Sequence, residues 1–199
     1  MKLLIALSLF VTQMSFAGTI KGSKHDFSGQ VWSGGEVCIA CHTPHRSMEH
    51  LDAPLWNHAL TTQTYTPYAS STMMATPGQP DGASKLCLSC HDGTIAIDSF
   101  NNTMGTVYIP TPINADLNSG EGHWKHPVSI VYDTNLAVAD TRLNDPSLTL
   151  STLGGTIQRD LLKNNKVQCN SCHDVHNSQG IDKLLKINST DLCVTCHNN

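Results

Sequence analysis

The sequence has little charge. Charged residues make up 14% of its 199 positions, against roughly 25% in an average soluble protein. Lysine and arginine together number 12, and the formal net charge is -4. A chain with so few cations lacks the basic field that nucleic-acid binding requires. We therefore expect no nucleic-acid partner, and a surface that is polar but weakly charged.

The sequence also has no apolar run long enough to span a bilayer. The most apolar stretch, residues 3–11, follows the cation Lys2 and precedes Ser15-Phe16-Ala17, a small-x-small pattern. This arrangement is typical of a secretory signal peptide that is cut after Ala17. We expect residues 1–17 to be removed, residues 18–199 to form one domain, and the protein to be exported without a transmembrane segment.

Long periodic apolar segments are scarce as well. Residues 128–132 (VSIVY) predict a short strand, residues 156–163 (TIQRDLLK) a short helix, and residues 181–187 another short helical or extended piece. Turn-rich stretches full of Pro, Gly, Asn and Asp separate them. The predicted fold is mostly irregular, with few short helices and strands. Because such a chain buries little of its own apolar surface, something other than side chains should supply the core.

No cysteine stands outside a motif. Each of the four C-x-x-C pairs is followed directly by a histidine, and this pattern is the attachment signal for haem c. Two thiols bond to the haem vinyl groups, and the histidine binds the iron from one face. The predicted thiol positions are Cys38, Cys41, Cys87, Cys90, Cys169, Cys172, Cys193 and Cys196. The predicted proximal iron ligands are His42, His91, His173 and His197.

Two other uses of eight cysteines compete with haem attachment. An exported chain can pair them in four disulfides, and two C-x-x-C pairs together can build a Cys₄ zinc site. Neither use explains a histidine directly after all four pairs. We therefore predict four covalently bound haem c groups, which would form the core of the fold.

A second histidine, His45, follows His42 by three positions in CIACHTPH. Three residues span at most roughly 10 Å, and Pro44 stiffens the link. His45 therefore cannot reach the opposite face of the iron that His42 holds, and as a ligand it must bind a different haem. His176 repeats this spacing after His173 in CNSCHDVH. Such histidines would tie neighbouring haems into a packed chain.

Seven histidines remain after the four proximal ligands, for four distal positions. His45 and His176 rank first because of their spacing. His126 follows, since it lies in a long stretch that otherwise offers the second haem little. His58, which has Trp56 nearby to cover a porphyrin face, and His25, upstream of the first motif, complete five candidates for four places. His50 and His123 rank below them.

Several segments together carry a family resemblance: SKHDFSG, CIACHTPH, APLWNH, CLSCHDGT, HPVSI, CNSCHDVH and LCVTCHNN, in this order. The chain resembles the doubled CxxCH multihaem cytochromes of metal-reducing bacteria, and in particular the secreted tetrahaem OmcE-type cytochromes. The resemblance implies a small, loop-rich extracellular cytochrome with bis-histidine haems. It also implies subunits that polymerise head to tail, with His45 at the position associated with ligation of a haem in the neighbouring subunit.

Three functions remain open at this point. The favoured one is extracellular electron conduction by a self-assembling filament, towards other redox proteins or metal oxides. The second is a monomeric periplasmic electron shuttle. The third, a multihaem reductase of a small oxyanion such as nitrite, needs an iron with an open position. Because the histidines suffice to close all four irons, we expect an electron carrier and no enzyme.

Overall fold

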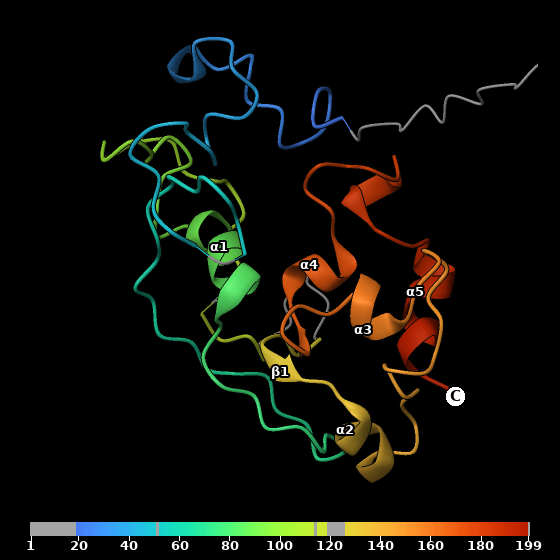
Figure 1. The fold of residues 1–199 in the computed structure, drawn as a ribbon. Coiled ribbons are helices and arrows are strands. Elements are labelled where there is room, and N and C mark those ends of the chain that lie inside the picture. The colour runs from blue at the N-terminus through green and yellow to red at the C-terminus, as the bar shows by residue number, and fades with distance from the viewer. Residues whose placement is uncertain (1–18, 51, 114, 119–125, 199) are drawn as a thin grey trace, which may run out of the picture.

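The computed structural model describes residues 19–50, 52–113, 115–118 and 126–198. Most of this chain is irregular, as the sequence predicts (Figure 1). The predicted signal peptide and His123 lie outside the described residues. In the part of the chain that the structure covers, no helix has the length and apolar character needed to cross a membrane.

The helices are short. They are η1 (Val31–Ser33), α1 (Gly82–His91), α2 (Thr134–Ala139), α3 (Ile157–Asp160), α4 (Cys169–Cys172), η2 (Asp182–Leu184) and α5 (Ser189–Cys196). Side-chain caps define two of the starts, since Asp133 accepts a hydrogen bond from the Leu136 amide and Thr156 accepts one from the Arg159 amide. The helix expected over residues 156–163 is thus confirmed as α3, but it covers fewer residues.

Two antiparallel strands, β1 (Ile130–Val131) and β2 (Lys166–Val167), form a small sheet in which Ile130 pairs with Val167. Strand β1 is shorter than the strand expected over residues 128–132. Left-handed backbone limits both strands, because Ser129 precedes β1 with a φ of 57° and Asn165 precedes β2 with a φ of 57°. Extended pairing cannot continue through residues in that conformation.

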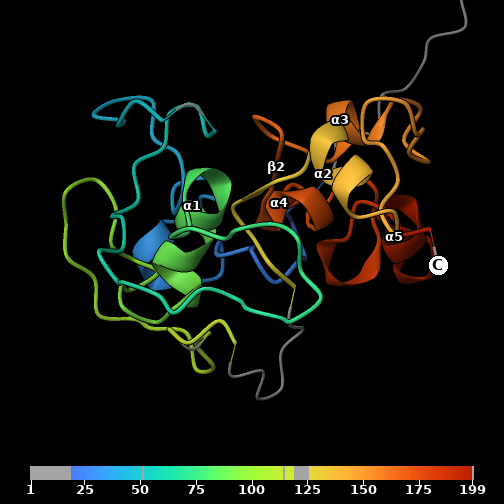
Figure 2. The same ribbon diagram turned by 90° about the horizontal axis from the view of Figure 1, so that it is seen from below.

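The described chain forms two lobes, which both views show side by side (Figures 1 and 2). The first lobe surrounds α1 and has a small apolar cluster of Ala53, Trp56 and Leu86. The second lobe contains β1, β2 and the helices α2 to α5. Its larger apolar cluster consists of Ile130, Tyr132, Ile157, Leu161, Val167 and Ile187. Each lobe therefore has its own apolar centre, and the first and second C-x-x-C-H units lie in one lobe, the third and fourth in the other.

Candidate haem-binding centres

The four C-x-x-C-H units adopt similar local structures. The second, third and fourth end the helices α1, α4 and α5. The first lies on a single helical turn, in which the His42 amide donates to the Cys38 carbonyl over 2.9 Å. The corresponding bond is 3.1 Å in the third unit and 2.9 Å in the fourth. All eight thiols are free. One turn of helix thus holds both thiols and the histidine of each unit close together.

Backbone contacts orient three of the proximal histidines. His42 pairs with Trp56, His173 with Leu185 and His197 with Leu143 in isolated β-bridges. These bridges fix the direction in which each histidine leaves its helical turn.

Two of these rings are oriented by a further bond. The Nδ1 atom of His42 lies 2.6 Å from the Pro54 carbonyl oxygen, and that of His173 lies 2.9 Å from the Lys183 carbonyl oxygen. An Nδ1–H that donates to a carbonyl leaves Nε2 unprotonated and free to bind a metal ion.

Three pairs of imidazoles fit the spacing of a bis-histidine iron. An imidazole nitrogen binds a transition-metal ion at about 2 Å, so two rings on opposite faces of one iron have centres about 6 Å apart. The ring centres of His91 and His25 lie 5.9 Å apart, those of His42 and His176 lie 6.3 Å apart, and those of His197 and His126 lie 6.4 Å apart. Each pair joins a proximal histidine to one of the candidate distal histidines.

The pairs differ in the angle between the two imidazole planes. It is 18° for His42 and His176, 56° for His91 and His25, and 76° for His197 and His126. The third pair also contains a fixed tautomer, because Nδ1 of His126 lies 2.9 Å from the Pro127 carbonyl oxygen. Sequence position alone had associated His126 with the second haem, whereas the structure places it beside the proximal histidine of the fourth unit.

Burial keeps members of these pairs neutral. Desolvation lowers the pKa of His25, with smaller contributions from the charges of His91 and His173. Desolvation also lowers the pKa of His197. The Nδ1 atom of His25 is buried and has no hydrogen-bond partner among the described residues. A neutral imidazole with an unused nitrogen in a buried position is suited to metal ligation, so these residues fit a haem iron.

His45 and His173 do not belong to any of the three pairs. Both are exposed. In the residues that the structure describes, His173 has no ring contact with another imidazole. The backbone of His45 is held in place, because its carbonyl accepts a hydrogen bond from Thr43 at 2.7 Å. A fixed backbone therefore presents the imidazole of His45 to solvent.

His58 has a different environment from the other candidates. It is 1% exposed, and its Nδ1 and Nε2 atoms lie 2.8 and 3.0 Å from the carbonyl oxygens of Ala59 and Ala96. Its Nε2 atom is also 3.4 Å from the Cys90 sulfur. Both ring nitrogens therefore have protein neighbours. His50, by contrast, accepts a hydrogen bond from the Asp52 amide at 3.3 Å and lines a surface cavity.

One buried carboxylate beside a predicted proximal histidine was missed by sequence reasoning. Asp92, directly after His91, is 9% exposed and accepts hydrogen bonds from the hydroxyls of Tyr65, Thr61 and Thr94 at 2.5, 2.7 and 2.7 Å. Burial raises the pKa of Asp92, but these bonds outweigh it and hold the pKa below its ordinary value. The only signal in the sequence is the C-H-D order, which recurs at Asp174.

No group of three or more His, Cys, Asp or Glu side chains suited to a metal ion occurs within the described ranges. Residues 163–199, which contain the third and fourth units, match the doubled CXXCH motif family. Comparison of the chain with curated proteins gives no match.

A C-x-x-C-H unit is the attachment pattern for haem c, so this matched segment has the residues to attach two haem c groups. Electron transfer is the chemistry such a segment supports.

Proposed function

We propose that this protein carries four bis-histidine haems and conducts electrons outside the cell, as the subunit of a head-to-tail filament of the OmcE type. The haem iron would supply the chemistry by cycling between its ferric and ferrous forms. The polypeptide would hold each iron between two imidazoles and fix the spacing of the haems.

The three imidazole pairs carry this proposal. Each links segments far apart in the sequence, at the distance that one shared iron requires. In two pairs, both members belong to the same lobe, whereas His42 and His176 come from different lobes. An iron between His42 and His176 would therefore connect the first lobe to the second, and would help to make one continuous path through the molecule.

The unpaired histidines support the filament. The iron of the third unit would have His173 on one face, and this residue is exposed and without an imidazole partner among the described residues. His45 is exposed on a fixed backbone and also outside the pairs. The exposed His45 of one copy would therefore be available to bind the iron held by the exposed His173 of another copy. Such a heterologous contact generates a filament when it does not close into a ring.

Cryo-electron microscopy of the haem-loaded protein, collected from its native host, tests the proposal directly. We expect ordered filaments in which His45 of one subunit binds the iron held by His173 of the next. His45→Ala should leave haem attachment intact, abolish filaments and open one iron in four to cyanide. His50→Ala is the matched control and should leave the filaments unchanged.

A monomeric periplasmic shuttle is the competing function. It would need a fourth distal ligand from within the chain, and His58 is the buried candidate. Particles of single subunits, with all four irons closed and with His58 bound to one of them, would refute the filament. An iron that binds nitrite in the assembled wild-type protein would instead favour a reductase.

A further inference from the structure

The attachment helices of the second and third units pack against each other across the junction between the lobes. Helices α1 and α4 are in direct contact, and the Cys169 amide in α4 donates to the Ser84 hydroxyl in α1. The second and third haem-binding units are therefore direct neighbours in space, although almost eighty residues of chain connect them.

Gln168, which directly precedes α4, joins these two helices through its side-chain amide. The residue is 3% exposed. Its Oε1 atom accepts hydrogen bonds from the Ser84 amide and the Ser129 hydroxyl, both at 3.1 Å, and its Nε2 atom donates to Asp81 at 2.8 Å. The Ser84 hydroxyl in turn accepts from the Cys169 amide at 3.0 Å. We call Asp81, Ser84, Ser129 and Gln168 the Gln168 cluster.

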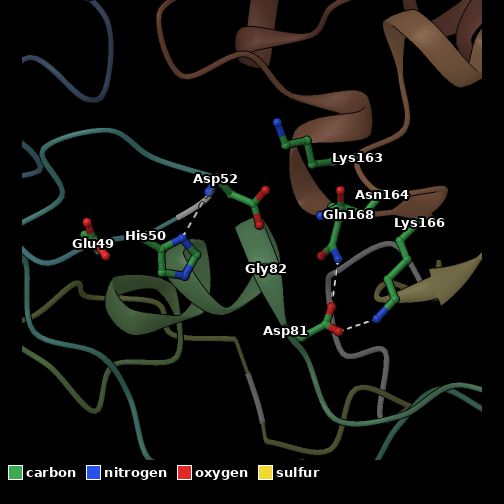
Figure 3. A pocket seen from close by; sticks show the side chains of 9 residues that line it. All are labelled: Glu49, His50, Asp52, Asp81, Gly82, Lys163, Asn164, Lys166 and Gln168. Atoms are coloured by element: carbon green, nitrogen blue, oxygen red, sulfur yellow. Dashed lines mark hydrogen bonds and ion pairs between the residues drawn. The ribbon is translucent and has the colours of Figure 1, made fainter.

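The Asp81 side chain bonds across the junction instead of capping its own helix. Asp81 is the N-cap residue of α1, yet its side chain makes no cap hydrogen bond to that helix. Its carboxylate instead accepts from Gln168 and pairs with Lys166, both of which belong to the other lobe (Figure 3). An aspartate at this position normally stabilises its own helix by capping it. Here it connects two helices instead.

Gly82 makes the close approach possible. A Cβ atom at this position would lie 2.7 Å from the Asp52 carboxylate and 3.2 Å from Gln168 Nε2. The φ of Gly82 is +49°, which side chains rarely permit. The cluster borders a cavity of about 400 Å³ that is open to the surface, and Figure 3 shows Asp81, Gln168 and Lys166 along its wall.

The buried residues of the two apolar clusters lie on either side of this junction. The cluster of Trp56 and Leu86 lies in the first lobe, and that of Ile130 and Ile157 lies in the second. Hydrogen bonds are directional, whereas apolar contacts tolerate small slips. A buried amide with three satisfied bonds is therefore well suited to fix the distance between two helices, because leaving any of those bonds unmade is costly.

We infer that Gln168 is a positioning residue that sets the spacing between the second and third haems, and with it the rate of electron exchange between them. The inference rests on the proposed haem chain and deepens it. Electron tunnelling weakens steeply with distance, so a small shift of α4 relative to α1 would slow exchange at this step and leave the other steps unchanged.

Gln168→Ala in the haem-loaded protein tests this role. We expect four attached haems and an unchanged low-spin absorption spectrum, since no ligand is altered. The exciton couplet in Soret circular dichroism, which depends on the spacing of neighbouring haems, should decrease. Electron exchange between haems, measured by nuclear magnetic resonance line widths at partial reduction, should slow several-fold. Gln158→Ala is the matched control, because Gln158 is an exposed amide bonded to Asn165.

A reciprocal pair of substitutions separates positioning from stability. Gln168→Glu is nearly isosteric, but it removes the donor to Asp81 and sets two carboxylates together, so it should reproduce the loss of the couplet. Adding Asp81→Asn restores a donor between these positions and should recover the couplet. These two variants, Gln168→Glu with and without Asp81→Asn, also test the inference if Gln168→Ala does not fold.

An unchanged couplet and exchange rate in Gln168→Ala and in Gln168→Glu would overturn the inference, even if both variants melted at a lower temperature. The second and third haems belong to the same chain, so the comparison of variants does not depend on assembly. Absence of filaments in the wild-type protein would therefore contradict the proposed polymer without affecting the assignment of Gln168.

Discussion

The imidazole rings of His42 and His176 lie 6.3 Å apart and nearly parallel, with 18° between their planes. His42 belongs to the first C-x-x-C-H unit, and His176 follows the third at three positions. His176 thus faces the histidine of a different C-x-x-C-H unit from the one that it follows, and we predicted a different haem for it because three residues are too few to reach round its own.

Replacement of His176 by alanine should open the iron of the first haem and leave that of the third unchanged. Nearly parallel ligand planes give a rhombic low-spin ferric signal in electron paramagnetic resonance. We expect one rhombic signal to be replaced by a high-spin signal, with four haems still attached. Loss of any other signal would contradict the pairing with His42. His50→Ala should leave the spectrum unchanged.

Replacement of His126 by alanine should affect a different signal. The planes of His126 and His197 are 76° apart, and near-perpendicular ligands give a strongly anisotropic low-spin signal with a large maximum g value. We expect this signal to disappear in His126→Ala, while the rhombic signal of the first haem persists. If the rhombic signal were lost instead, His126 would not be the partner of His197.

Replacement of Tyr65 by phenylalanine should destabilise the first lobe. Tyr65 is 5% exposed, and its hydroxyl donates to the buried Asp92 at 2.5 Å. A hydrogen bond to a charged group contributes about 1.5–3 kcal/mol, so we expect a loss of that order in the free energy of unfolding. Chemical denaturation measures it. Tyr108→Phe, at an exposed tyrosine, is the control and should change little.

The same bond gives the protein an acid-sensitive component of stability. Burial raises the pKa of Asp92, but hydrogen bonds led by that of Tyr65 lower it by more, so the folded pKa lies below the ordinary value of an aspartate. This contribution is therefore present above about pH 4 and is lost as the pH falls through the folded pKa. Denaturation at pH 6 and pH 3 should show a smaller acid-induced loss in Tyr65→Phe than in wild type. Equal losses would show that Tyr65 does not lower the pKa of Asp92.

Replacement of Gly82 by alanine should strain the start of α1. The added Cβ would lie 2.7 Å from an Asp52 carboxylate oxygen, at a φ of +49°. Such backbone strain costs about 1–3 kcal/mol, and we expect the midpoint of thermal unfolding to fall. Gly78→Ala is the matched control, because no atom lies within 4 Å of its added Cβ. Equal midpoints for the two variants would argue against a close approach at Gly82.

Local patterns in the sequence predicted the attachment chemistry and the irregular character of the fold. The short strand at residues 130–131 and the helix that begins at Ile157 were also recognisable, since apolar residues and a threonine cap mark them. Their lengths were overestimated, because left-handed residues such as Ser129 end the extended pairing and carry no clear signal in sequence. The sequence analysis did not predict α1, and the side chain of its N-cap residue Asp81 bonds to Gln168 of the other lobe.

The sequence by itself determined which residues form the four C-x-x-C-H units, and so which residues we predict to attach haem, because two thiols and a histidine must lie within one helical turn, and a turn is local. It also determined that His45 and His176 cannot serve their own haems, because a three-residue link is too short. Only the tertiary structure decided which histidines face each other. The ring pairs join distant segments, and the packing of two lobes brings them together through contacts that no local pattern contains.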